Sequence, residues 1–113
     1  MFDPTTDAVV ETNRLVGEKG IVIKPNELHS AFASLDYYET DLEKFASVVR
    51  SVMQNHPFAD GNKRTGVFLL IAACDVLGIQ SNHSDDAWVE FAVRSVTERW
   101  SVARIAEFVL EGR

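Results

Sequence analysis

The sequence has few of the residues that build disulfides, membrane spans or secretion signals. Its single cysteine, Cys74, excludes an internal disulfide and a cysteine-rich zinc site. The longest apolar run, Val67–Cys74, has eight residues, whereas a membrane-spanning helix needs about 20. The first residues, MFDPTTD, are acidic and contain no apolar stretch, so we expect no signal peptide. The sequence therefore predicts a cytoplasmic protein without membrane contact.

Positive charge is also scarce, with 11 Lys and Arg against 17 Asp and Glu and a net charge of −6. Proteins that bind nucleic acid usually carry a basic excess, so we expect no nucleic-acid partner. The 46 % hydrophobic and 25 % charged residues are ordinary for a globular protein. The 113 residues suit one domain spanning 1–113. An anionic ligand would require positive charge gathered at one place.

Helical patterns cover most of the chain. Five predicted helices each follow a polar residue suited to an N-cap, namely Asp3, Asn26, Thr40, Ser84 and Ser101. Thr40 and Glu43 have capping-box spacing and open a helix that ends near Asn55. The first helix is expected to start at Asp3-Pro4 and to stop near Gly17. The fold class predicted from these patterns is all-α.

The segment 62–77 is predicted to form the central helix of this bundle. Its middle, VFLLIAAC, is apolar on every side, and such a helix is expected to be buried all round. Gly78 is the expected stop of this helix. Residues 20–25, GIVIKP, depart from the helical pattern, because they are rich in β-branched side chains between Gly and Pro. They predict a short strand or hairpin.

One polar segment, residues 55–66 (NHPFADGNKRTG), joins the two longest predicted helices. His56 precedes a proline there and can titrate near neutral pH, as a general base must. A histidine facing the dipole of a helix C-terminus is the simpler alternative for that residue alone. Asp60 offers oxygen ligands to Mg²⁺, although an Asp-Gly turn would explain it equally well. Phe58 is apolar within a polar loop and is expected to insert into the core.

The second half of this segment has the features of an anion site. Gly61 allows a ligand to approach the backbone closely, and Asn62, Lys63 and Arg64 then open a helix. Free N–H groups and the helix dipole favour anions at such a helix start. Lys63 and Arg64 are the only adjacent basic pair in the sequence. Together with the candidate base and metal ligand they indicate phosphate-centred transfer. The stretch GNKRT lacks the spacing of a Walker A loop.

The ten residues HPFADGNKRT resemble the Fic/Doc family signature, histidine-x-phenylalanine-x-acid-glycine/alanine-asparagine-x-arginine. The resemblance implies the compact helical core of that family. It also implies that His56 deprotonates a target hydroxyl and that Asp60 binds Mg²⁺. It further implies that the nucleotide phosphates are bound by Gly61, Asn62, Lys63 and Arg64. Phe58 would anchor the loop.

The segment GIVIKP is similar to the family's flap, which clamps a target peptide by strand addition. The resemblance therefore implies that Ile21, Val22 and Ile23 contact the target. Many Fic proteins also carry an inhibitory motif, S/T-x-x-x-E-G/N, and no Ser or Thr in this sequence has Glu four residues on. The resemblance thus implies inhibition by a separate antitoxin protein.

Two positions resemble the Doc branch of the family, the death-on-curing toxins. AMP-transferring Fic proteins usually have a glycine after the asparagine and a second arginine three residues beyond the first. Lys63 and Val67 occupy those places. The Doc resemblance implies ATP- and Mg²⁺-dependent phosphoryl transfer to a hydroxyl of a translation elongation factor, elongation factor Tu. Pro57 and Gly61 fit the AMP-transferring form as readily, so AMP transfer stays an alternative. A non-catalytic helical interaction module is the second alternative.

Overall fold

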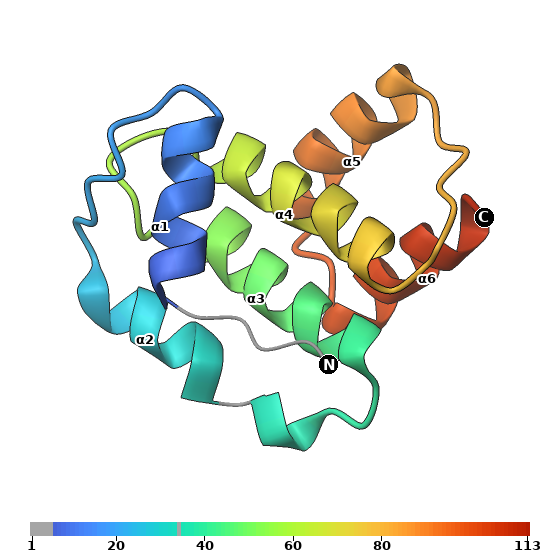
Figure 1. Cartoon of the computed structure of the whole chain (residues 1–113), viewed down its shortest axis with the longest axis horizontal. Coiled ribbons are helices and arrows are strands. Elements are labelled where there is room, and N and C mark those ends of the chain that lie inside the picture. The colour runs from blue at the N-terminus through green and yellow to red at the C-terminus, as the bar shows by residue number, and fades with distance from the viewer. Residues whose placement is uncertain (1–5, 34) are drawn as a thin grey trace.

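The fold is an all-α bundle, as the sequence predicts. A computed structural model describes residues 6–33 and 35–113 of the chain, in which six α-helices and one 3-10 turn follow one another (Figure 1). The elements are α1 (Thr6–Leu15), α2 (Pro25–Ala33), η1 (Leu35–Tyr37), α3 (Asp41–Asn55), α4 (Asn62–Val76), α5 (Asp85–Thr97) and α6 (Val102–Glu111). The helix start expected at Asp3-Pro4 lies outside the described residues.

Most helix starts follow local capping rules. Thr40 and Glu43 form the expected capping box at the start of α3, each side chain bonding the other's backbone N–H. Ser84 and Ser101 accept hydrogen bonds from the first turns of α5 and α6. Asn26 is not the cap of α2, because that helix begins one residue earlier at Pro25. The fixed φ of proline suits the first helical position.

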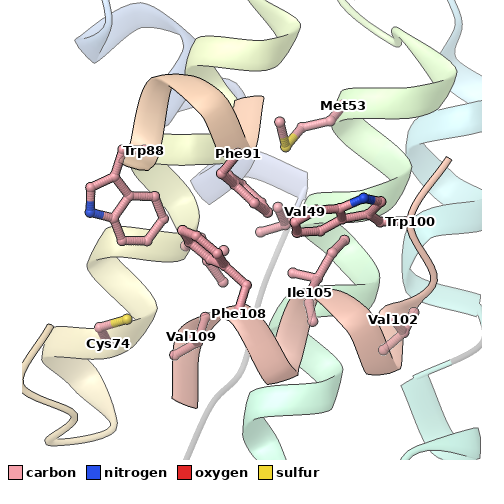
Figure 2. Packing of buried hydrophobic residues seen from close by; sticks show 12 residues of the cluster. Val49, Met53, Cys74, Trp88, Phe91, Trp100, Val102, Ile105, Phe108 and Val109 are labelled. Carbon is pink, nitrogen blue, oxygen red and sulfur yellow. The ribbon is translucent and has the colours of Figure 1, made fainter. Parts of the chain in front are cut away.

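Helix α3 lies at the centre of the bundle and packs against α2, α4, α5 and α6. It contributes Val49 and Met53 to a large apolar cluster with the helices of the C-terminal half (Figure 2). Within that cluster Phe91 stacks on Phe108 with ring centroids 4.7 Å apart. Cys74 is buried there, and burial raises the pKa of its thiol.

A second cluster lies on the other side of α3, between α1, α2 and the loop before α4. Its buried members are Val9, Leu28, Val48, Val52 and Phe58. Because Val48 and Val52 alternate along α3 with the residues of the first cluster, one helix joins the two cores. The loop between α3 and α4, residues 56–61, carries most of the Fic-like signature and is called the signature loop below. It packs against the hydrophobic core through Phe58.

Helix α4 is not buried on every side as its composition suggested. Phe68, Ile71 and Val76 are 46 %, 43 % and 64 % exposed. Among the described helices, α1, α3 and α5 make the main contacts with α4, and they leave this face open. On the opposite face Gly66 lies against Met53, where a Cβ atom would collide, so α3 and α4 approach closely. Among the described residues, none of the helices has both the length and the apolar content that a membrane crossing requires.

The segment 20–25 forms neither a regular strand nor a hairpin. Only residues 21–23 are extended, around a single antiparallel bridge that joins Val22 to Phe58. The N–H of Ile23 donates to the carbonyl of Pro57 at 2.8 Å. Because Pro25 already begins α2, the segment is too short to turn back on itself, and it pairs with the signature loop instead.

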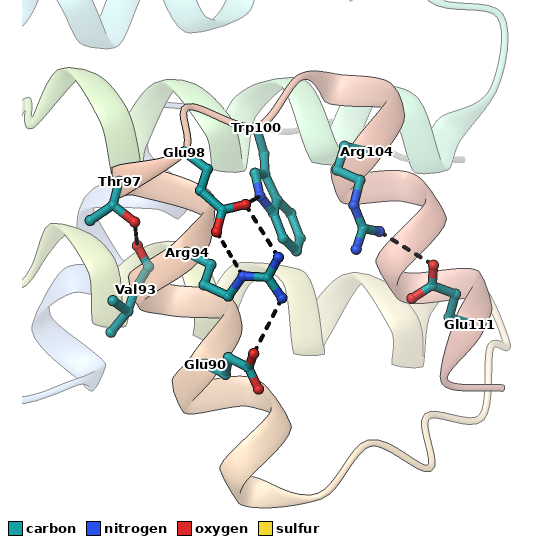
Figure 3. Close-up of polar contacts among 8 residues, drawn as sticks. All are labelled: Glu90, Val93, Arg94, Thr97, Glu98, Trp100, Arg104 and Glu111. Carbon is teal, nitrogen blue, oxygen red and sulfur yellow. Dashed lines mark hydrogen bonds and ion pairs between the residues drawn. The ribbon is translucent and has the colours of Figure 1, made fainter.

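A polar network closes the junction of α5 and α6 (Figure 3). Arg94 forms ion pairs with Glu90 at 3.2 Å and Glu98 at 2.8 Å. The indole N–H of Trp100 also donates to Glu98, at 3.0 Å. The hydrogen bond from Arg94, followed by that from Trp100, lowers the pKa of Glu98. The guanidinium of Arg104 lies 4.2 Å from the centre of the Trp100 ring.

Candidate active site

A cavity of about 690 Å³ opens between the residues around Ile23 and Lys24, the signature loop and α5. This size lies within the range of roughly 300–1,000 Å³ that small-molecule sites occupy. Ile23 and Lys24 line it from the extended segment, and Trp88, Val89 and Ala92 line it from α5. The remaining lining residues come from the signature segment and α4, namely His56, Phe58, Ala59, Asp60, Gly61, Asn62, Lys63, Arg64 and Val67.

His56 terminates α3 in a left-handed conformation, with φ 52° and ψ 59°. Glycine is the usual residue at such a helix end, because a side chain disfavours positive φ. The left-handed turn leads the chain from α3 into the signature loop. It leaves the His56 side chain exposed at the cavity, where the imidazole can meet an incoming hydroxyl group.

Phe58 and Asn62 fix the shape of this loop. The Phe58 ring is 1 % exposed and belongs to the core cluster shared with Val52. The Asn62 side chain accepts a hydrogen bond from the Phe58 N–H and donates one to the Phe58 carbonyl, both at 3.0 Å. The amide of Asn62 is thus occupied by the loop, and a phosphate would meet this residue at its backbone N–H.

The start of α4 has the geometry of an anion site. Its N-cap, Gly61, is left-handed with φ 75° and provides no capping side chain. The first N–H groups of α4 consequently have no partner within the helix, and the dipole favours negative charge there. A Cβ atom on Gly61 would collide with Glu18, so only glycine fits. The site suits the phosphates of a nucleotide.

Asp60 stands beside this helix start as a candidate metal ligand. One of its carboxylate oxygens accepts from the Gly61 N–H at 2.8 Å, and no partner among the described residues holds the other. Mg²⁺ is commonly held by one or two carboxylates together with substrate phosphates. An exposed carboxylate next to a phosphate-sized anion site fits that pattern.

The two adjacent cations are used differently. Lys63 is exposed at the cavity and has no partner in the part of the chain that the structure describes. The guanidinium of Arg64 donates to the carbonyl of Val16 at 2.9 Å and pairs with Glu18 at 3.0 Å. Arg64 thereby ties α4 to the loop that follows α1, while Lys63 stays available to a ligand.

One edge of the extended segment 21–23 faces away from the signature loop. The carbonyl of Ile21 accepts from the Ala59 N–H at 2.9 Å, and the Ile23 N–H also faces the signature loop. Since backbone groups alternate along an extended chain, the N–H and carbonyl of Val22 face the other way. The side chains of Ile21 and Ile23 are about half exposed. This edge can pair with one residue of an extended peptide.

Several residues of the site had no signal in the sequence. Asn13 and Glu18 reach the signature loop from α1 and from the loop after it. Lys24 belongs to the segment 20–25 that the sequence singled out, but its place at the cavity, with its Nζ donating to the carbonyl of Asn55 at 3.4 Å, was not predicted. The α5 wall, including Trp88, comes from far along the chain. Their spacing from the signature is irregular, so no local pattern predicts them.

More than half of the chain matches a known protein family. The model of the Fic/DOC family matches residues 6–74, from the start of α1 to the last turn of α4. The matched range contains the extended segment, His56 and the whole signature loop. A comparison with curated proteins finds no match. The chain belongs to the Fic/DOC family, whose members are in general nucleotide-dependent, protein-modifying enzymes or toxins.

Proposed function

We propose that this protein is a Doc-like toxin that transfers a phosphoryl group from ATP to a hydroxyl side chain of elongation factor Tu. The observation that supports this choice is the pair of residues at the cavity wall, Lys63 and Val67. AMP-transferring Fic proteins usually have a glycine and a second arginine there. The long side chain of Lys63 fills space that a glycine would leave open beside the start of α4. The side chain of Val67 has no charge with which to bind a phosphate, unlike an arginine at that place.

The chemistry then follows from the positions of three groups. His56 accepts the proton of the target hydroxyl as that oxygen bonds to the terminal phosphorus and the bond to ADP breaks. Lys63 and the first N–H groups of α4 stabilise the charge on the transferred group. Asp60 would hold Mg²⁺, and the bound ion would offset the negative charge of the phosphate oxygens.

The proposal includes two protein partners. The free edge of Val22 would bind an extended segment of the elongation factor by adding a strand, beside the exposed side chains of Ile21 and Ile23. Family members often work with antitoxins, and the absence of the inhibitory motif from this sequence favours an antitoxin that acts in trans. Both partners would be met in the cytoplasm.

The intact mass of purified elongation factor Tu, incubated with the chain, ATP and Mg²⁺, tests the proposal. A gain of one phosphate is the expected result. A gain of a nucleotide monophosphate would assign the chain to AMP transfer, which the residues Pro57 and Gly61 fit as readily.

The matched control is His56→Asn. Asparagine tolerates the left-handed conformation of position 56, so the variant keeps the loop and loses the base. We expect the transfer rate to fall by roughly 10²- to 10⁴-fold. If the folded variant is as toxic in cells as the original chain, the non-catalytic interaction module is the better description.

A further inference from the structure

Asn13 is a buried polar residue that bonds to three separate segments of the site. It lies in α1 and is 1 % exposed. Its side-chain N–H₂ donates to the carbonyl of Asp60 and to the hydroxyl of Thr65, each at 3.0 Å. Its side-chain oxygen accepts from the Gly20 N–H at 2.9 Å. These partners lie 47, 52 and 7 residues away in sequence.

Each partner of Asn13 adjoins a working part of the site. Asp60 carries the candidate metal ligand, and Gly20 directly precedes the extended segment 21–23. Thr65 is fully buried in the first turn of α4, at the anion site. One amide therefore fixes the metal ligand, the helix start and the target-binding edge relative to one another.

The chemistry of these contacts requires an amide. Two of the three bonds use an N–H donor and the third uses an acceptor, and among small side chains only the asparagine amide supplies two N–H donors together with an acceptor. The space is also closely filled. A Cβ atom on Gly61 would lie 3.4 Å from the Asn13 amide nitrogen, and the Asn13 backbone carbonyl accepts from the Glu18 N–H at 3.1 Å.

We propose that Asn13 is the positioning residue of the site, holding the Asp60 carboxylate and the segment 20–23 in a fixed relation. The proposal rests on the proposed function for the roles of those two parts. Its consequence is that loss of the amide impairs Mg²⁺ use and target binding together, although Asn13 touches neither.

Asn13→Asp is the sharpest test, because it keeps the size of the side chain and the acceptor for Gly20. It turns a carboxylate oxygen toward the Asp60 carbonyl in place of a donor. We expect the Mg²⁺ concentration for half-maximal transfer to rise about tenfold or more, with a higher KM for the target protein. Asn26→Asp, an exposed change of the same type in α2, is the control and leaves both values unchanged.

Amide hydrogen exchange provides a readout that is independent of transfer. In Asn13→Asp the hydrogen-bonded amides within 20–24 and 58–61, namely those of Gly20, Ile23, Lys24, Phe58, Ala59 and Gly61, should exchange about tenfold faster, while those of α5 and α6 keep their rates. Thr65→Val removes only the bond from Asn13 to the Thr65 hydroxyl, and it should speed the exchange of the bonded amides in 58–61 without affecting those in 20–24.

The outcomes separate the two proposals. Uniformly faster exchange, or unchanged exchange in either segment of Asn13→Asp, overturns the positioning role, as does an unchanged Mg²⁺ requirement in a variant that still transfers. If the exchange changes as expected but the original chain modifies no protein, the fixed relation stands and the proposed function fails.

Discussion

At the scale of single residues, the basic pair at the start of α4 is partly neutralised by a carboxylate. Glu18 pairs with Arg64 and also lies against Gly61, where a Cβ atom would collide with it. Its side chain is only 20 % exposed, so solvent screens this charge less than that of a surface glutamate. Lys63 and the helix N–H groups are left as the main positive features of the anion site.

This arrangement predicts that Glu18→Gln strengthens nucleotide binding. Glutamine keeps an acceptor for the Arg64 guanidinium and removes the negative charge beside the phosphates. We expect the Kd for ATP, measured by calorimetry without target protein, to fall about threefold at low salt. The difference from the original chain should shrink as salt is added.

Glu11→Gln is the control, because this substitution changes the net charge by the same amount. Glu11 pairs with Arg14 on the exposed side of α1. An equal gain in both variants would attribute the effect to net charge. Weaker binding in Glu18→Gln would contradict the prediction and show that the ion pair holds Arg64 in place for the ligand.

At the scale of elements, the α5–α6 junction predicts a pH dependence of stability. The bonds from Arg94 and Trp100 lower the pKa of Glu98 in the folded protein. Such a carboxylate stabilises the fold above its unfolded pKa of about 4.3, and this contribution is lost as the pH falls through the folded pKa. The Tm of Glu98→Gln should therefore be lower than that of the original chain at pH 7, and the two should converge at low pH.

Glu39→Gln is the matched control, because Glu39 is exposed and has no ion-pair partner among the described residues. Its Tm should follow that of the original chain over the same pH range. A gap for Glu98→Gln that stays constant down to low pH would contradict the assignment of this stability to the charged carboxylate.

Elements whose cause is local could be predicted from the sequence. Three helices are capped by Thr40, Ser84 and Ser101, each through a hydrogen bond to the residue three positions later. These local bonds fix where α3, α5 and α6 begin. The signature segment could be identified from the sequence as well, because its residues are consecutive. Its left-handed turns at His56 and Gly61 bring them to one cavity.

Features that depend on distant neighbours could not be predicted. The pattern of α4 shows that Phe68 and Ile71 are apolar, but only the arrangement of α1, α3 and α5 decides that they stay exposed. Likewise, nothing near Asn13 in sequence indicates that Asp60 is its partner, because the bond joins residues 47 apart. The pairing of the extended segment with the signature loop could not be predicted either, because it also joins residues far apart in the sequence.

At the scale of the whole molecule, the net charge of −6 describes the surface and not the site. Lys24 and Lys63 line the cavity that also receives the N-terminus of α4, so positive potential gathers there within an acidic protein. Under the proposed function, this contrast would concentrate positive charge where the nucleotide phosphates bind.

The sharing of α3 by both apolar clusters predicts that the described helices unfold as one cooperative unit. Trp88 and Trp100 both report on one cluster, whereas Leu28 is buried in the other. We expect Leu28→Ala to lower the free energy of unfolding by about 2–5 kcal/mol. Its denaturant midpoints by tryptophan fluorescence and by far-UV circular dichroism should shift together, because Val48 and Val52 lie on the same helix as Val49.

Val76→Ala is the control for this test, since Val76 is 64 % exposed and its truncation should change stability by no more than about 0.5 kcal/mol. A fluorescence midpoint that stays in place in Leu28→Ala while the circular dichroism midpoint falls would mean that the α1–α2 side unfolds by itself. The site would then be built on the less stable part, because Phe58 anchors the signature loop in the Leu28 cluster. Coincident midpoints mean that the loop, the extended segment and the α5 wall of the cavity share the stability of a single core.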